Sequence, residues 1–166
     1  MIRHLTGELL TCLIGRASTL KLVPAILLLT AAAGQAAENY AFQFDITLSD
    51  RAAAALRDAN ETITVEAWYF GLPNEAGREH AEGGFVYLGS ESMELPPQTA
   101  TVRVSGKTFD PSRLAWIEGE IVTAVSVYSS RRSSDDNLIT CDTFHEELKT
   151  VQSEPPALHC VLNDEL

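Results

Sequence analysis

Two long segments near the middle of the chain alternate between two faces with a period of two residues. In residues 61–71, one face is Ile63, Val65, Ala67 and Tyr69, and the other is Thr62, Thr64, Glu66 and Trp68. In residues 118–128, Ile121, Thr123, Val125 and Val127 alternate with Val122, Ala124, Ser126 and Tyr128. β-Branched and aromatic residues in such a pattern favour strands. We expect these segments to be the inner pair of a β-sandwich, with the remaining chain wrapped around them.

Shorter strands are predicted on both sides of this pair. Residues 40–48 and 99–105 each alternate cleanly, which is typical of a strand with one face in water. Residues 85–88 and 91–95 are two separate strand candidates, because Gly89 and Ser90 interrupt the pattern between them. Residues 138–141 and 158–162 complete the set. The total of about seven short segments is the number expected for a small sandwich.

Two short helices are predicted at connections between strands. Ser49 can cap residues 50–59, where alanine and leucine recur at helical spacing, and Asn60 can end that helix in the left-handed conformation. Thr143 and Glu146 have capping-box spacing for a second helix, whose apolar face would be Phe144, Leu148 and Val151. The fold class is therefore all-β: an antiparallel β-sandwich, Ig-like or transthyretin-like in its proportions, with two short connecting helices.

The N-terminal segment has the features of a secretory signal peptide. Lys21 precedes a short apolar run, which is followed by small residues suited to cleavage after Ala36 or Ala37. A signal anchor is the alternative, although the apolar run is short for a membrane span. A lipid anchor at Cys12 is rejected because Thr11 precedes it. We therefore expect residues 1–37 to be removed and residues 38–166 to form one exported domain, periplasmic or secreted, without a stable membrane span.

The charge balance restricts the partners of this domain. Removing Arg3, Arg16, Lys21 and Glu8 from the 12 basic and 23 acidic residues leaves 9 and 22, a formal net charge of −13. Nucleic acids and anionic lipid surfaces would repel such a chain. A basic protein partner would be attracted to it.

Two cysteines remain after the leader is removed, Cys141 and Cys160. An even pair in an exported chain predicts a disulfide bond, which would close a loop with 18 intervening residues. The alternative is a reduced pair in a metal site together with His145 or His159, but zinc ligands usually have shorter local spacings. The sequence therefore favours the disulfide.

No motif specifies a reaction. His145 and Glu146 resemble the start of a zincin helix, but Lys149 stands where the second histidine belongs. The segment Gly89 to Ser92 lacks the glycine pattern of a serine-hydrolase elbow. Asp135, Asp136, Asn137 and Asp142 supply oxygen atoms without the regular spacing of a calcium loop, so a solvated turn is favoured. We expect no cofactor and no metal.

These exclusions favour an exported, non-catalytic binding or envelope-associated module that engages a protein partner through its acidic surface and loops. The candidate surface comprises Trp68 together with residues of the loops 72–84 and 129–137, namely Glu75, Arg78, His80, Arg131, Arg132, Asp135 and Asp136. The alternative is a small periplasmic or secreted hydrolase or metal-dependent enzyme, which would use His80 or His145 with nearby carboxylates.

Overall fold

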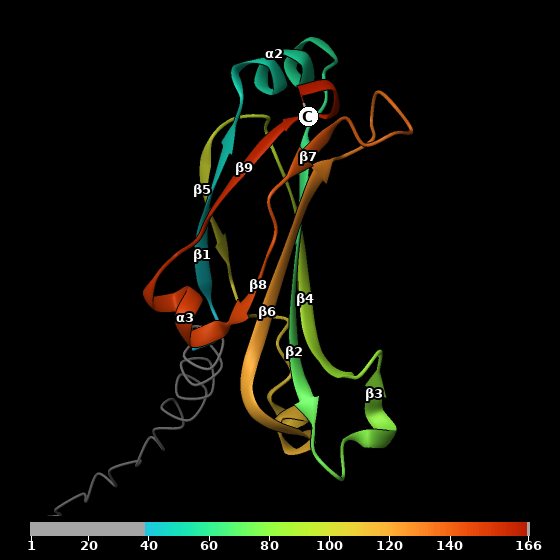
Figure 1. Ribbon diagram of the computed structural model, residues 1–166, viewed down its shortest axis with the longest axis vertical. Helices are drawn as coiled ribbons and strands as arrows, with labels where there is room; N and C mark the ends of the chain where they lie inside the picture. Colours follow the sequence, from blue (N-terminus) through green and yellow to red (C-terminus); the bar gives the residue numbers. More distant parts are fainter. Residues whose placement is uncertain (1–38, 166) are drawn as a thin grey trace, which may run out of the picture.

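The computed structural model describes residues 39–165, so the predicted leader lies outside the described residues (Figure 1). The strands are β1 (Phe42–Leu48), β2 (Ile63–Pro73), β3 (Ala81–Glu82), β4 (Phe85–Leu95), β5 (Ala100–Val104), β6 (Ile117–Ser129), β7 (Ile139–Cys141), β8 (Phe144–Glu147) and β9 (Ala157–Leu162). The helices are α2 (Asp50–Asp58) and α3 (Leu148–Ser153), with three short 3-10 turns, η1 (Arg78–His80), η2 (Pro111–Trp116) and η3 (Asn163–Glu165). The described chain is therefore mostly β, as predicted.

The strands form two sheets. One has four strands in the order β5-β1-β9-β7, and the other has five in the order β3-β4-β2-β6-β8. The five-stranded sheet is antiparallel throughout, whereas β1 and β9 pair in parallel, with Ile46 opposite Leu158. The prediction of a wholly antiparallel fold was therefore wrong for the four-stranded sheet. Periodicity shows which residues share a face but carries no information on strand direction.

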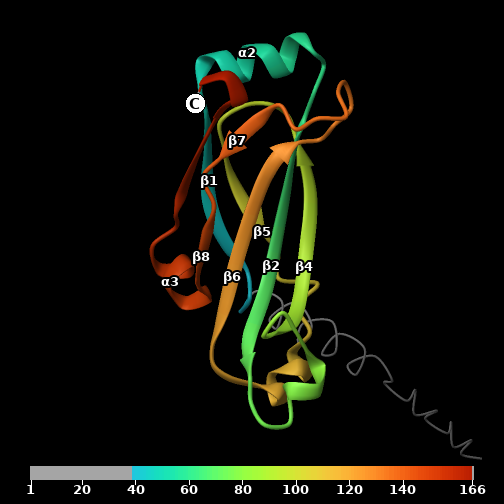
Figure 2. The same cartoon turned by 45° about the vertical axis from the view of Figure 1, so that its right-hand side comes forward.

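The strands expected at the centre do lie at the centre of the five-stranded sheet. β2 is flanked by β4 and β6 (Figure 2), and its partners on β6 run from Ile63 opposite Ser129 to Pro73 opposite Ile117. Ile63, Val65, Ala67 and Tyr69, which were predicted to share one face, are fully buried. Thr123, Val125 and Val127 of β6 are buried on the same side.

One hydrophobic core joins the two sheets. Phe44 and Ile46 of β1, Val104 of β5 and Leu158 of β9 belong to the same buried cluster as the inner residues of β2 and β6. The hydroxyl of Tyr69 lies within this core and donates a hydrogen bond to the carbonyl of Tyr40 at 2.9 Å. Burial, together with the nearby Glu91 carboxylate, raises the pKa of Tyr69. The two sheets are thus the two layers of a single packed unit.

Helix α2 begins and ends as predicted. Ser49 accepts a hydrogen bond from the backbone N–H of Ala52, and Asn60 has a φ of 53° just beyond the helix. Leu56 is fully buried, so α2 closes one end of the two-sheet core. Within residues 39–165 no helix is long and apolar enough to cross a membrane.

The helix predicted to begin at Thr143 is wrong in its first turn. Residues 144–147 form β8, which pairs with β6 so that Phe144 lies opposite Val125. The Phe144 ring contacts those of Phe42 and Phe44, with centroids 6.2 Å and 5.8 Å away. Pairing with a free strand edge and packing of this ring outweigh the capping-box preference. The helix starts only at Leu148.

The break predicted between residues 88 and 91 is also wrong, because β4 continues through it as one strand. Tyr69 pairs with Gly89 and Phe70 pairs with Tyr87, so Leu88 is an extra residue in a β-bulge. Gly89 has a φ of 147°, and a β-carbon there would lie 2.4 Å from the carbonyl oxygen of Thr108. Glycine therefore permits the bulge and the close approach of a neighbouring loop instead of ending the strand.

The predicted disulfide is present between Cys141 and Cys160. These residues stand directly opposite one another on the antiparallel strands β7 and β9. The bond therefore ties the last strand to the segment that leads into β8, as expected from the sequence.

Candidate functional site

The structure does not bring the predicted surface residues together. The loop after Pro73, with Glu75, Arg78 and His80, lies at the end of the five-stranded sheet marked by β3 in Figures 1 and 2. The loop after Ser129 lies at the opposite end, beside α2. The 11 residues of β2 separate the two loops by about 35 Å. The predicted residues of the two loops therefore lie at opposite ends of the sheet.

The loop after β2 is held by Asn74 and Gly77. The side-chain amide of Asn74 donates to the carbonyls of Ala115 and Ile117, and its oxygen accepts from the backbone N–H of Gly77. His80 stacks on Trp116 with ring centroids 3.8 Å apart, and its Nε2 lies 3.6 Å from the Glu79 carboxylate. His80 therefore packs on an aromatic ring, with the Glu79 carboxylate beside it.

The loop after β6 is anchored by Glu61, which is 2% exposed. One carboxylate oxygen accepts from the backbone N–H groups of Arg132 and Ser133 and from the Ser133 hydroxyl, at 2.8–2.9 Å. The other accepts from the backbone N–H of Thr62 at 3.0 Å. Burial raises the pKa of Glu61, but hydrogen bonds from Ser133, Thr62 and Arg132 outweigh it and keep the pKa below its ordinary value. Sequence reasoning missed this residue, because a Glu before a strand normally faces water.

The two predicted arginines of this loop are likewise engaged. Arg132 forms an ion pair with Glu94 of β4, and the guanidinium of Arg131 lies 5.9 Å from the centroid of the Tyr128 ring. The two predicted aspartates of this loop are not engaged in this way. Within residues 39–165, the carboxylates of Asp135 and Asp136 form no hydrogen bond or ion pair. The acidic part of the loop is therefore the part available to a ligand.

A groove of about 480 Å³ begins at Asp136. Its floor is apolar and comes from three elements, with Ala55 and Ala59 at the C-terminal end of α2, Leu138 before β7, and Leu162 at the end of β9. Asp136 and Asp164 stand at its rim, and Asp164 is paired with Arg51 at 2.9 Å. We call this the upper groove. It combines apolar surface with one uncompensated carboxylate.

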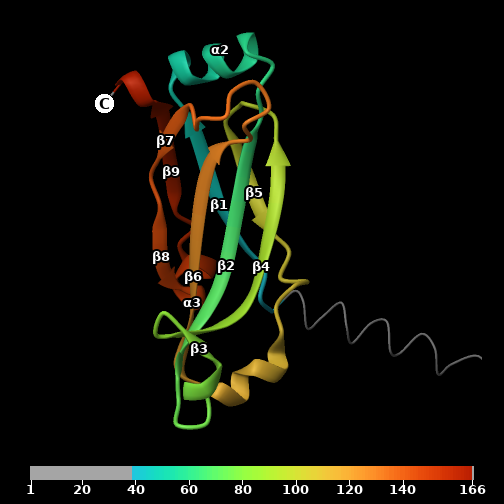
Figure 3. The same ribbon diagram turned by 90° about the vertical axis from the view of Figure 1, so that its right-hand side faces the viewer.

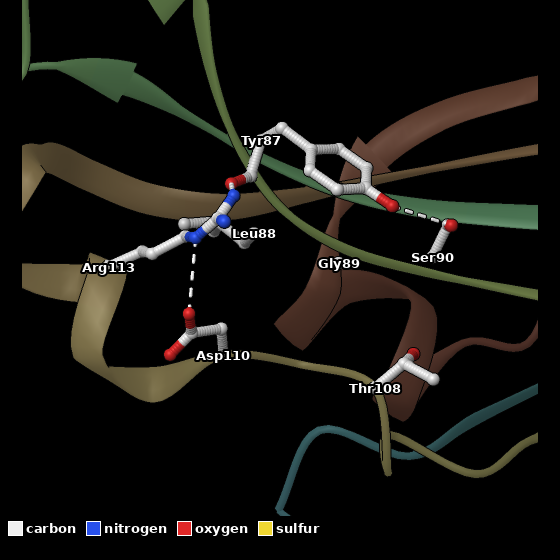
Figure 4. A pocket seen from close by; sticks show the side chains of 7 residues that line it. All are labelled: Tyr87, Leu88, Gly89, Ser90, Thr108, Asp110 and Arg113. Atoms are coloured by element: carbon white, nitrogen blue, oxygen red, sulfur yellow. Dashed lines mark hydrogen bonds and ion pairs between the residues drawn. The ribbon is translucent and has the colours of Figure 1, made fainter. Parts of the chain in front are cut away.

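A second, more polar pocket of about 270 Å³ lies at the bulge of β4 (Figure 4). Its lining residues are Tyr87, Leu88, Gly89, Ser90, Thr108, Asp110 and Arg113. Arg113 donates through Nε to Asp110 at 3.1 Å and through Nη1 to the carbonyl of Tyr87 at 2.7 Å. Hydrogen bonds from Ser112, and then the charge of Arg113, hold the pKa of Asp110 below its ordinary value. We call this the bulge pocket.

No pattern in the sequence indicated the bulge pocket directly. Asp110 caps η2, where it accepts from the backbone N–H of Ser112. Arg113 had no assigned role. The available signal was Gly89, an isolated glycine within a strand pattern, which often marks a bulge or a close backbone approach.

Trp68 lies on the outer face of the five-stranded sheet, midway between the two loops. Figure 3 shows β6, β2 and β4 in front of β1 and β5, with no helix over this face. Trp68 is half-buried, and its cross-strand neighbours, Ser90 and Ala124, are small. Its indole N–H has no hydrogen-bond partner, and its rings contact no other aromatic ring, among residues 39–165. Trp68 thus presents a partly exposed indole on this face.

The two histidines named for the enzyme alternative lie on different elements, His80 in η1 and His145 in β8. His145 is exposed on β8, where its ring meets Phe85 with centroids 6.0 Å apart, and His80 stacks on Trp116. Neither lines the upper groove or the bulge pocket. In the described part of the chain, no three His, Cys, Asp or Glu side chains are grouped closely enough to hold a metal ion.

Comparison of the chain with protein-family models, with curated proteins and with solved structures found no match.

Proposed function

We propose that residues 38–166 form an exported, non-catalytic binding module that engages a basic protein partner. The observation that carries this proposal is the upper groove, in which an apolar floor meets the unpaired carboxylate of Asp136. The occupant we propose is a partner segment that presents an aliphatic side chain next to a lysine or arginine. The aliphatic group covers Leu138 and Leu162, and the cation pairs with Asp136.

Three electrostatic features favour a cation at this end of the molecule. The C-terminal end of α2, where the helix dipole places partial negative charge, lines the groove. Asp135 adds a second unpaired carboxylate beside the groove. The surplus of acidic residues described above would steer a basic partner towards the domain from a distance of about 10 Å at moderate salt.

Export is part of the proposal and rests on two observations. The N-terminal sequence has the composition of a cleaved leader, and the disulfide between Cys141 and Cys160 suits an oxidising compartment. N-terminal sequencing of the protein recovered from a periplasmic or culture fraction tests it. A first residue near Glu38 is expected, and a chain that retains residues 1–37 in the cytoplasm would contradict it.

We also propose that the two-sheet unit belongs to the Ig-like or transthyretin-like class of β-sandwich. Four and five strands around one shared core support this assignment, and the parallel β1–β9 pair must be accommodated within it. An experimental structure decides the question. Strand connections that match neither class would overturn the assignment and leave the two-sheet description intact.

The binding proposal is tested with amphipathic peptides of defined composition. The probe is a leucine–lysine peptide, and the controls are the same peptide with glutamate in place of lysine and a lysine-only peptide. Amide chemical shifts of Ala55, Ala59, Leu138 and Leu162 report contact with the groove. We expect saturable, salt-sensitive shifts with the leucine–lysine peptide alone, because both apolar contact and cation pairing are needed.

Two variants and one control variant locate the contact. Asp136→Asn should weaken binding and reduce its salt dependence, whereas Glu75→Gln removes one charge at the far end of the sheet and should leave binding unchanged. Ala55→Phe should fill the groove and abolish binding, with thermal unfolding to confirm that the domain remains folded. Equal effects of Asp136→Asn and Glu75→Gln would show that only net charge matters, which would contradict a specific groove.

A further inference from the structure

Ser90 connects the bulge pocket to Trp68, which does not itself line the pocket. Ser90 lines the pocket and is also the cross-strand neighbour of Trp68. Tyr87 is 41% exposed, and its hydroxyl donates to the Ser90 hydroxyl at 2.6 Å (Figure 4). A continuous surface therefore runs from the Trp68 indole, past two hydroxyl groups, into the pocket.

Several polar groups on this surface still have unused hydrogen-bonding capacity. Within residues 39–165, the Thr108 hydroxyl, the Nη2 group of Arg113 and the indole N–H of Trp68 have no partner. The guanidinium of Arg113 nevertheless cannot move freely, because Asp110 and the carbonyl of Tyr87 hold it, with the cation 5.9 Å from the Tyr87 ring centroid. Fixed donors beside flat rings are the features of a small-molecule site rather than of an ordinary surface.

We infer that Trp68 and the bulge pocket form a binding site for a neutral oligosaccharide. A pyranose ring presents C–H groups on its faces and hydroxyl groups around its edge. The faces fit the indole of Trp68 and the ring of Tyr87, which offer apolar area with a polar group at one end. The hydroxyl groups fit Thr108, Ser90, Arg113 and Asp110, which together supply both donors and acceptors.

The pairing of Arg113 with Asp110 selects against an anionic ligand. A sulfate, phosphate or carboxylate would meet an arginine already neutralised by its partner, in a domain with an excess of acidic residues. A hydroxyl group needs no net charge and can bond to both members of the pair. The chemistry of the pocket therefore favours an uncharged, hydroxyl-rich ligand.

The edge of β4 is also unsuited to an added peptide strand at this point. A peptide that extends a sheet needs free backbone groups on the edge strand. At the bulge, the carbonyl of Leu88 accepts from the backbone N–H of Asp110 at 2.8 Å, and the carbonyl of Tyr87 accepts from Arg113. These two acceptors are already used, so the surface recognises its ligand through side chains.

Binding is tested on the purified domain with two neutral probes, the hexasaccharides of β-1,4-linked glucose and of β-1,4-linked N-acetylglucosamine, and with unstructured casein as a polypeptide probe. Titration is followed by calorimetry and by the indole N–H resonance of Trp68. We expect saturable binding of at least one saccharide, with a shifted Trp68 resonance and little dependence on salt. Casein should leave that resonance unchanged.

The variants separate stacking from hydrogen bonding. Trp68→Ala should lower the affinity at least about tenfold, whereas Trp116→Phe, which changes the other tryptophan of the domain, should not alter it. Ser90→Ala and Thr108→Val should each lower the affinity about threefold or more, with the thermal midpoint recorded to exclude unfolding.

Three outcomes would overturn the inference: no saturable binding of either hexasaccharide, saccharide binding that survives Trp68→Ala, or a Trp68 shift with casein alone. The third would identify the surface as a polypeptide site. Because the upper groove lies at the end of the sheet beside α2, Asp136→Asn should not affect the saccharide titration. The peptide-binding proposal for the upper groove and the saccharide-binding inference for the bulge pocket can therefore be refuted independently.

Discussion

Glu61→Gln tests whether the buried carboxylate holds the loop between β6 and β7. The two carboxylate oxygens accept four hydrogen bonds, from the backbone N–H groups of Thr62, Arg132 and Ser133 and from the Ser133 hydroxyl. Glutamine has nearly the same shape, but one of its terminal groups is an NH₂, which cannot accept. Whichever way the amide turns, at least one N–H that now meets an oxygen will face another donor.

The expected cost follows from these contacts. An unpaired buried donor costs about 1–3 kcal/mol, and the remaining bonds lose the strengthening that a charged acceptor gives. Arg132 and Ser133 are exposed at the surface, so water can relieve part of this loss. We therefore expect Glu61→Gln to lower the free energy of unfolding by about 2 kcal/mol, which corresponds to about 6–8 °C in the thermal midpoint for a domain of this size.

The effect must depend on pH in one direction. Because the folded-state pKa of Glu61 lies below the ordinary carboxyl value of 4.5, the stabilisation is complete above that value and disappears as the pH falls through the folded-state pKa. Urea unfolding from roughly pH 7 to pH 3 measures this, with Glu75→Gln as an exposed control. The variant and the parent should converge in acid. Equal midpoints at neutral pH, or an undiminished difference in acid, would refute the reasoning.

Three further perturbations test the packing. Replacing Cys141 and Cys160 together by alanine should lower the free energy of unfolding by about 3 kcal/mol, given their sequence separation of 19. In the parent protein, alkylation without reduction followed by mass spectrometry should label neither cysteine. Gly77→Ala should cost about 1–3 kcal/mol in urea unfolding, because a β-carbon there would lie 1.9 Å from the carbonyl oxygen of Trp116, whereas Ala76→Gly in the same loop should cost less. Tyr69→Phe should cost about 1–2 kcal/mol by removing the hydrogen bond to Tyr40, and an unchanged midpoint would show that water replaces the lost donor.

Alternation was enough to find the central strands, because each has one face buried in the core and a register slip would expose that face. It also identified Ile63, Val65, Ala67 and Tyr69 as sharing one face of β2, which is the buried face. Local signals failed where a distant contact decided the structure. Phe144 lies in a strand and not in the predicted helix, because its ring packs against Phe42 and Phe44. These two residues are far away in the sequence, so no local pattern encodes the contact.

The candidate sites were harder to predict than the fold, because each combines residues from separate elements. Trp68 was named from the sequence, and alternation placed it on the face opposite Ile63 and Tyr69, which the structure shows to be the outer one. Arg113 becomes significant only once the bulge at Gly89 brings η2 beside β4. Asp136 was selected for its charge, but its neighbour Leu162 is known only from the sheet order.

The parallel pairing of β1 with β9 constrains the order in which the chain can fold. β1 is the first described strand and β9 the last, and β9 lies between β1 and β7. Residues 63–129 contain β2, β4 and β6, which can pair as soon as they are available because each neighbour follows within the same stretch. The four-stranded sheet, in contrast, stays incomplete until β9 has been made, so the edge of β1 that pairs with β9 stays unpaired until then.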